Sequence, residues 1–227
     1  MPRLRHQSAL VLLAAALASL LVGACGTIEL APPPPELPLF KRIDARVGVV
    51  YTSAAYNTAI VNPLLRVDVG KASVRNFERA FASMFTTAIT LPDWPPWREL
   101  DAQARSRIDA VIELARVDAE LVFGNDRSSS NPLLHGLTGG VPDRVSIGYH
   151  VCLYQPDGTP IRCWSTSSHQ VHQRQVGECL DLRTCIGPQV EIAMREALAR
   201  FLLEAESDPE LAAWAAGLAQ RVQREKR

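Results

Sequence analysis

The sequence lacks the features that mark several large functional classes. Its 24 basic residues balance 24 acidic ones, so the formal net charge is zero. A neutral chain has no electrostatic footprint of a nucleic-acid-binding protein. After residue 24, no apolar run approaches the roughly 20 residues that a membrane-spanning helix needs, and no internal repeat is present. These absences favour an ordinary globular domain that does not bind nucleic acid.

Motifs of the common enzyme classes are also missing. No serine lies in a Gly-x-Ser-x-Gly nucleophile elbow. Val69–Ser73 matches only the tail of a phosphate-binding loop, because the leading glycine is absent at the required spacing. Acidic residues are scattered, and no two of them stand out as an acid and base pair. We therefore predict that the protein is not an enzyme and that it needs no cofactor.

Three histidines raise the question of a metal site. His150 belongs to a predicted strand, and His169 and His172 lie near the end of its predicted hairpin partner. A structural zinc site needs four nitrogen or sulfur ligands, and a catalytic site needs three with an open position. No acidic residue sits at a diagnostic spacing, and the cysteines are better explained as disulfides. The sequence therefore predicts no metal.

The N-terminus carries the most specific signal in the chain. A basic start is followed by an apolar core from Ala9 to Leu21 and by small residues before Cys25. This is the pattern of a secretory signal peptide, here residues 1–24. Ala9–Ala24 is too short for a spanning anchor. A membrane-spanning anchor is one alternative to a cleaved lipoprotein signal. The other is an ordinary signal peptide that is cut nearby and leaves Cys25 as a free thiol.

Val22-Gly23-Ala24-Cys25 resembles the lipobox of bacterial lipoproteins. The resemblance implies cleavage before Cys25 and a diacylglycerol on its thiol, so that a lipid anchor holds the protein on a membrane. In the enteric version of the family, Asp after the cysteine retains the protein in the inner membrane. Gly26 therefore implies an outer-membrane protein that faces the periplasm.

Two regions are expected after the signal peptide. Residues 25–41 contain the lipidated cysteine and a proline-rich tether, and residues 42–227 form one periplasmic α+β domain. At about 3.1 Å per residue, a polyproline stretch over residues 26–40 would reach roughly 45 Å and hold the domain off the membrane. Without Arg3 and Arg5, 22 basic residues face 24 acidic ones, a net charge of −2.

Four cysteines remain in the domain, namely Cys152, Cys163, Cys179 and Cys185. An exported chain with an even number of cysteines is expected to form disulfides, and three pairings are open to them. Asp157-Gly158 is a hairpin-turn signal, and a two-residue loop there places Cys152 opposite Cys163. We therefore predict Cys152–Cys163, with Cys179–Cys185 closing a small loop.

Hydrophobic periodicity predicts an α+β two-layer sandwich, in which two or three helices cover one face of an antiparallel or mixed sheet. Ser207 and Glu210 fit the N-cap and N3 positions of a capping box. The expected elements are strands over 43–51, 64–69 and 108–122, hairpin arms over 144–155 and 159–171, and helices over 72–89, 188–206 and from 207 into the basic tail.

Two loops are candidate partner surfaces, because exposed aromatic and apolar loop residues often bind other proteins. Folding of both loops onto the core is the alternative. The candidates are Trp94 and Trp97 in one loop, and Leu133, Leu134 and Leu137 in the long loop over residues 124–143.

With its lipobox, proline spacer and order of elements, the chain resembles the lipopolysaccharide-assembly and transport-auxiliary lipoproteins of the outer membrane. This resemblance implies an accessory or adaptor in an envelope complex for lipid or lipopolysaccharide transport. A module that binds a small apolar ligand is the first alternative, and an envelope enzyme is the second.

Overall fold

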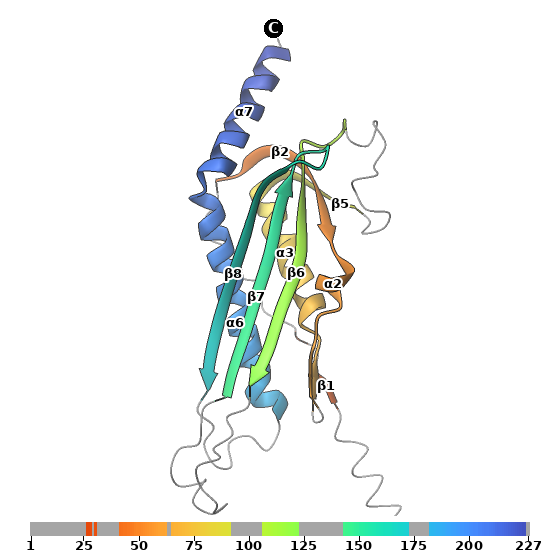
Figure 1. The fold of residues 1–227 in the computed structure, drawn as a ribbon, viewed down its shortest axis with the longest axis vertical. Helices are drawn as coiled ribbons and strands as arrows, with labels where there is room; N and C mark the ends of the chain where they lie inside the picture. Colours follow the sequence, from red (N-terminus) through yellow and green to blue (C-terminus); the bar gives the residue numbers. More distant parts are fainter. Residues whose placement is uncertain are drawn as a thin grey trace, which may run out of the picture.

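The computed structural model describes residues 26–28, 30, 41–62, 65–91, 106–122, 143–172 and 182–225. It is an α+β fold with a mixed five-stranded sheet, whose strands lie in the order β5 (Phe85–Thr90), β2 (Ile43–Tyr51), β6 (Ala110–Val122), β7 (Asp143–Tyr154) and β8 (Pro160–His172). Helices α3 (Val69–Met84) and α6 (Leu182–Glu206) lie together against one face of this sheet (Figure 1). The predicted fold class is therefore confirmed.

Where the connection itself is described, consecutive elements are joined by short segments. The strands are β1 (Gly26–Ile28), β2 (Ile43–Tyr51), β3 (Ile60–Asn62), β4 (Leu65–Val67), β5 (Phe85–Thr90), β6 (Ala110–Val122), β7 (Asp143–Tyr154) and β8 (Pro160–His172). The helices are α2 (Ser53–Tyr56), α3 (Val69–Met84), α6 (Leu182–Glu206) and α7 (Pro209–Glu225).

The large sheet combines two kinds of pairing. Strand β2 runs parallel to both β5 and β6, whereas β6, β7 and β8 form an antiparallel meander. A separate small sheet has the order β1-β4-β3. None of the described helices is long and apolar enough to cross a membrane.

The core lies between the helices and one face of the large sheet. Phe77 of α3 contacts Tyr149 of β7 edge to face, with ring centroids 4.9 Å apart, and also contacts Phe201 of α6 at 5.5 Å. Burial of each large apolar side chain contributes about 1.5–3 kcal/mol. The buried face predicted for the α6 sequence is confirmed, since each member is at most 1% exposed: Val190, Met194, Ala197, Leu198, Phe201 and Leu202.

The first long helix is shorter than predicted. It ends at Met84 instead of continuing to residue 89, and Phe85–Thr90 forms strand β5 beside β2. Residues 85–90 read Phe-Thr-Thr-Ala-Ile-Thr, and β-branched and aromatic residues favour strands. Phe85 and Ala88 continue the helical spacing of the preceding stripe, so periodicity alone overextends the helix.

The starts of the last two helices also differ from the prediction. Helix α6 begins at Leu182, so Pro188 lies inside it and does not open it. Helix α7 is capped by Asp208, whose Oδ1 accepts from the amides of Glu210 and Leu211 at 2.9 and 3.1 Å. Ser207 is not the cap, because its hydroxyl donates to carbonyl oxygens of the preceding helix. Pro209 then takes the first helical position, where proline is favoured.

The turn of the β7–β8 hairpin is longer than a two-residue loop. The Gly158 amide donates to the Gln155 carbonyl at 2.9 Å, and Gly158 has φ 93°. This left-handed conformation suits glycine. A register shift after Leu153 then restores the predicted pairing of Cys152 with Cys163. The turn prediction was therefore wrong in loop length and right in register.

The segment after Cys25 packs on the domain. Strand β1 runs parallel to β4, with Gly26 opposite Leu65. Leu30 is 3% exposed and belongs to the main core, and its carbonyl accepts from the Arg75 guanidinium at 2.7 Å. The sequence predicts a tether over residues 25–41; within it, residues 26–28 and Leu30 contact the domain.

Candidate functional site

The face of β6, β7 and β8 that points away from α3 and α6 is polar, and we call it the open sheet face. Alternation along β7 buries Val145, Ile147 and Tyr149 against the helices, so the residues between them point to the other side. Pairing across the three strands arranges these side chains in rows. The rows are Arg116, His150 and Ser165; Asp118, Gly148 and Ser167; and Glu120, Ser146 and His169.

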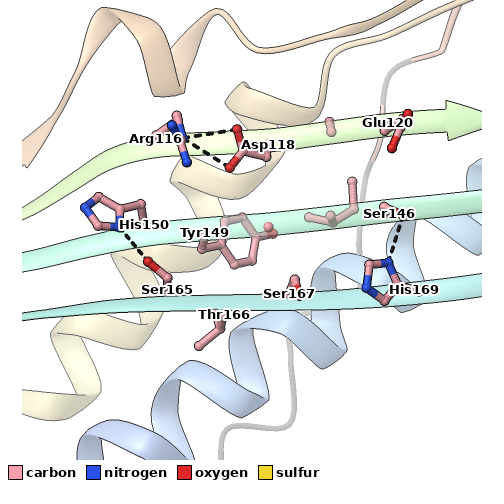
Figure 2. Close-up of a pocket in the computed structure, with 13 residues that line it drawn as sticks. Arg116, Asp118, Glu120, Ser146, Tyr149, His150, Ser165, Thr166, Ser167 and His169 are labelled. Carbon is pink, nitrogen blue, oxygen red and sulfur yellow. Dashed lines mark hydrogen bonds and ion pairs between the residues drawn. The ribbon is translucent and has the colours of Figure 1, made fainter.

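Two serine–histidine pairs stand on the open sheet face (Figure 2). Nδ1 of His150 lies 2.8 Å from Oγ of Ser165, and Nδ1 of His169 lies 2.8 Å from Oγ of Ser146. Each pair joins β7 to β8 at directly opposite positions. Cross-strand hydrogen bonds of this kind hold both side chains in place, so the face presents fixed donors and acceptors.

The middle row forms the floor of a shallow hollow of about 490 Å³. Gly148 has no side chain there, so the backbone of β7 is accessible between the two serine–histidine pairs. Asp118 lies beside Gly148 and pairs with Arg116 on the same strand, with Nε 3.1 Å from a carboxylate oxygen. The hollow therefore offers both charge signs and several hydroxyls.

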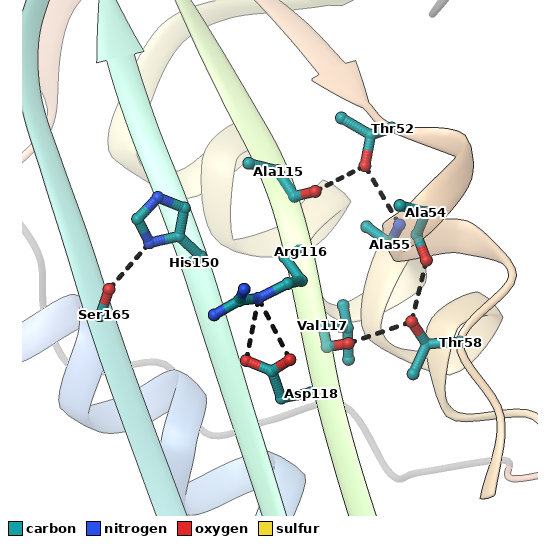
Figure 3. Close-up of polar contacts among 10 residues, drawn as sticks. All are labelled: Thr52, Ala54, Ala55, Thr58, Ala115, Arg116, Val117, Asp118, His150 and Ser165. Carbon is teal, nitrogen blue, oxygen red and sulfur yellow. Dashed lines mark hydrogen bonds and ion pairs between the residues drawn. The ribbon is translucent and has the colours of Figure 1, made fainter.

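The part of β6 that carries these charges is fixed by a bulge and by α2 (Figure 3). The register of β6 shifts between Leu114 and Arg116. Oγ1 of Thr52 donates to the Ala115 carbonyl at 2.7 Å, and Oγ1 of Thr58 donates to the Val117 carbonyl at 3.1 Å. These two hydroxyls form hydrogen bonds with carbonyl groups that would otherwise lie unpaired at the edge of β6.

The disulfide Cys152–Cys163 lies at one end of the open sheet face, with Cα atoms 4.1 Å apart. It locks the hairpin that carries both serine–histidine pairs. Sγ of Cys152 is 3.5 Å from Nε2 of His150. Although the two sulfurs and the imidazole are clustered, the sulfurs bond to each other and cannot serve as thiolate metal ligands.

The histidines do not converge on one point. His150 and His169 lie in rows four residues apart, which is about 13 Å at a strand rise of about 3.3 Å per residue. One metal ion cannot be bound by side chains so far apart. The side chain of His172 lies outside the described residues. The geometry therefore lends no support to the metal hypothesis considered from the sequence.

The two serine–histidine pairs can be compared with the arrangement of an activated nucleophile. An activated serine needs a base that a third group orients. Among the described residues, no carboxylate contacts the free ring nitrogen of His150 or His169, and the only other close group is Sγ of Cys152. Elsewhere, burial raises the pKa of the Tyr149 phenol, but this side chain points into the core.

A second hollow of about 570 Å³ lies where the start of β2 meets the end of α6 and α7. Alanines of α7 supply much of its lining, beside the charged residues Lys41, Arg42, Asp44 and Glu206. We call it the α7 groove. Its main apolar residues are Ile43, Ala205, Leu211, Ala212, Ala215, Ala216 and Ala219.

Comparison with known proteins finds no matching family model and no matching curated protein. Similar solved structures include a minor lipoprotein from Acinetobacter baumannii, at TM-score 0.43 and 6% identity over 74% of this chain and 94% of that one. A DUF330-family protein from Xanthomonas campestris aligns at TM-score 0.42 and 8% identity over 89% and 99%.

Lipoprotein B from Nitrosomonas europaea aligns at TM-score 0.42 and 11% identity, covering 79% of this chain and 92% of that one. Two of these three structures are thus named as lipoproteins. With TM-scores below 0.5, the similarities carry no functional argument, so the function has to be argued from this chain's own residues.

Most of the site residues predicted from sequence lie outside the described part of the chain. These are Cys25, Trp94, Trp97, Leu133, Leu134, Leu137, Cys179 and the side chain of Cys185. The structure brings together Cys152 and Cys163 as predicted. Sequence reasoning missed the rows of the open sheet face, because alternation assigns a residue to a face but does not identify its neighbour on the next strand.

Proposed function

We propose that the chain is a lipid-anchored protein of the outer membrane that faces the periplasm and docks a protein of the cell envelope on its open sheet face. The observation that carries the docking role is the hollow floored by Gly148, with fixed serine–histidine pairs on either side of it. Transport or assembly of lipid or lipopolysaccharide is the process that we assign to this complex.

The anchor rests on the lipobox ending at Cys25. The disulfide Cys152–Cys163 supports the same compartment, because structural disulfides persist in oxidising environments such as the periplasm. A multiply acylated cysteine would supply the more than one chain that stable anchoring requires. Intact-mass measurement of the membrane-extracted protein is expected to find acyl chains on Cys25. An unmodified N-terminus at any other residue would refute the anchor.

Docking of a protein is favoured over chemistry because the exposed groups have complementary charges but no catalytic arrangement. Arg116 and Asp118 are each more than half exposed. A partner segment that carries both charge signs would be complementary to them. We propose that the protein is not an enzyme and that its serine–histidine pairs position donors and acceptors for this partner.

The docking role is tested by comparing variants of the open sheet face with a matched surface variant. Arg116→Glu reverses a charge in the first row, and Ser167→Trp fills the hollow from the middle row. Arg79→Glu reverses an exposed charge on α3, on the far side of the sheet. The lipidated proteins are cross-linked in the envelope, purified and compared by quantitative mass spectrometry.

An envelope protein should be recovered with the parent and with Arg79→Glu. Its yield should fall at least about tenfold in both open-face variants. A tenfold loss of affinity corresponds to about 1.4 kcal/mol of binding free energy. Circular dichroism and unfolding curves check that the variants are folded. Recovery of the same partner by all four proteins, or of no reproducible partner by the parent, would refute the docking role.

A second candidate function is the binding of a small apolar ligand in the α7 groove. Its volume falls within the usual range of ligand sites, and its lining combines alanines, Ile43 and Leu211 with charged residues at the start of β2. Ala216→Trp would fill the groove, whereas Ala213→Trp changes an exposed residue of the same helix that does not line it. Loss of fluorescent fatty-acid binding in Ala216→Trp alone would support this function, and absence of binding by the parent would exclude it.

A further inference from the structure

The structure assigns the membrane-facing end of the domain. We infer that the end formed by the small sheet β1-β4-β3 lies directly against the lipid headgroups, with no proline spacer between. This inference rests on the proposed lipidation of Cys25. It concerns a surface that the docking proposal does not use.

A short covalent path joins the proposed anchor to the domain. Gly26 follows Cys25 in the chain, and consecutive Cα atoms are 3.8 Å apart. Gly26 also pairs with Leu65 of β4. A lipid chain on Cys25 therefore holds the beginning of β4 within a few ångströms of the acylated residue, instead of at the roughly 45 Å that a free spacer would allow.

The described residues of this segment, 26–28 and 30, are held to the domain at three points. Strand β1 pairs with β4 over three residues, Leu30 is buried in the main core, and the Arg75 guanidinium donates to the Leu30 carbonyl. The proline-rich residues 31–40 follow β1 in the sequence and precede β2. They come after the docked segment, so they cannot set the distance between anchor and domain.

Exposed apolar residues lie on β3 and at the ends of β6 and β8. Val61 of β3 is 66% exposed, Val122 at the end of β6 is 47% exposed, and Val171 near the end of β8 is 57% exposed. Figure 1 shows the tips of β6 and β8 at the same end of the molecule as β1, opposite the C-terminal end of α7. Single exposed valines are unremarkable, but three at the anchored end suit contact with a bilayer.

The open sheet face then runs along the length of the domain away from the membrane. Strands β6, β7 and β8 extend from the anchored end toward the opposite end (Figure 1). The α7 helix lies farthest from the bilayer. A partner on the open sheet face would be approached from the periplasm, and the same orientation leaves this face uncovered by lipid.

The test uses two insertions of identical sequence on either side of the docked segment. An eight-residue Gly/Ser segment that begins with Gly is placed between Cys25 and Gly26, or between Pro33 and Pro34. In each protein a fluorophore is attached through an azide-bearing residue at Val61 or at Gln220, which is exposed on α7. The lipidated full chain is reconstituted in phosphatidylethanolamine–phosphatidylglycerol vesicles that contain a headgroup spin-labelled lipid.

Quenching at position 61 should exceed quenching at position 220 several-fold in the parent. The insertion before Gly26 adds a span of about 15 Å and should remove most of that difference, whereas the insertion between Pro33 and Pro34 should leave it unchanged. Equal quenching at the two positions, or equal effects of the two insertions, would overturn the inference. Shielding of position 61 from lipid by a second copy of the protein would also overturn the inference.

The acylation of Cys25 is measured by intact mass on the same samples. Protein without acyl chains would refute the proposed anchor together with this orientation. Acylated protein with the wrong quenching pattern would refute the orientation alone and leave the proposed function standing. The two failures are therefore distinguishable.

Discussion

Arg162 of β8 and Asp208 at the start of α7 form an ion pair, with Nε and Oδ2 2.8 Å apart. The Asp208 side chain is only 4% exposed and also caps α7 through its other oxygen. One carboxylate thus joins the hairpin to the C-terminal helix. Burial alone would raise the pKa of Asp208, but the amides of Leu211 and Glu210 and the charge of Arg162 outweigh it and lower the pKa below its ordinary value.

Because the folded-state pKa of Asp208 is lowered, its charge stabilises the fold above the unfolded pKa of about 4 and loses that effect as the pH falls through the folded pKa. We expect Asp208→Asn, which keeps an acceptor for the cap, to lose about 1 kcal/mol at pH 7, and Asp208→Ala about 2 kcal/mol. Urea unfolding between pH 7 and pH 2 checks this.

The stability difference between the parent and Asp208→Asn should shrink toward pH 2. Glu210→Gln is the matched control, because Glu210 is an exposed second partner of Arg162 at 3.6 Å. Exposed ion pairs contribute little, so its effect should stay below about 0.5 kcal/mol. A constant difference between the parent and Asp208→Asn across the pH range would contradict the assignment.

The buried hydroxyls of Ser73 and Tyr149 give a prediction of non-additivity. They lie 3.3 Å apart, and the Ser73 hydroxyl lies 2.9 Å from the Val69 carbonyl oxygen. Val69 is the closer of the two acceptors open to the Ser73 proton, so we assign the proton to it, and Tyr149 then donates to Ser73. Ser73→Ala leaves the phenol without an acceptor and should cost about 1–3 kcal/mol, whereas Tyr149→Phe should cost about 1 kcal/mol.

The double variant Ser73→Ala/Tyr149→Phe should be no less stable than Ser73→Ala alone, because no buried donor remains unpaired. Equilibrium unfolding of the four proteins forms a double-mutant cycle. Strictly additive losses would show that the two hydroxyls act independently.

The disulfide gives a third prediction. The chain-entropy model assigns about 2–3 kcal/mol to a loop of this size, closed here over a separation of 11 residues. Cys152→Ala/Cys163→Ala should unfold at a correspondingly lower urea concentration. A reductant should lower the midpoint of the parent by more than that of the double variant, in which only the predicted Cys179–Cys185 bond remains to be reduced. Equal midpoints for parent and variant would mean that the hairpin is held without the bond.

The buried faces of strands and helices were predictable from the sequence where apolar residues recur at the spacing of a strand or of a helix. Alternation in residues 145–153 placed the core face of β7, and the α6 stripe from Val190 to Leu202 was placed by helical spacing. The Cys152–Cys163 pair followed from the hairpin register. These are local patterns, in which the residues that decide the structure are close in the chain.

The remaining features depend on contacts between distant segments. Strand β5 forms because β2 offers a parallel edge to Phe85–Thr90, and nothing within the segment announces that neighbour. The cap moved from Ser207 to Asp208 because Arg162 and Pro209 favour it. The rows of the open sheet face require the register of three strands, including the shift at Arg116, which no single strand encodes.

A pair of glycines provides the last prediction, which links the fold to the open sheet face. Gly70 of α3 donates its amide to the Thr58 carbonyl at 2.8 Å, and a Cβ there would collide with backbone carbonyls of Ala55 and Tyr56. Gly217 of α7 has nothing within 4 Å of a built Cβ. Gly217→Ala should therefore stabilise the helix by about 0.5–1 kcal/mol.

Gly70→Ala should destabilise the protein by about 1–3 kcal/mol, because backbone atoms cannot move aside as a flexible side chain would. It should also displace α2, whose flanking residues Thr52 and Thr58 hold the β6 segment that carries Arg116. We expect partner recovery to fall in Gly70→Ala at temperatures where the protein is still folded, and to stay at the parental level in Gly217→Ala. A Gly70→Ala protein as stable as the parent would show that α2 and α3 can separate without cost, and the support of the open sheet face by α2 would then be refuted.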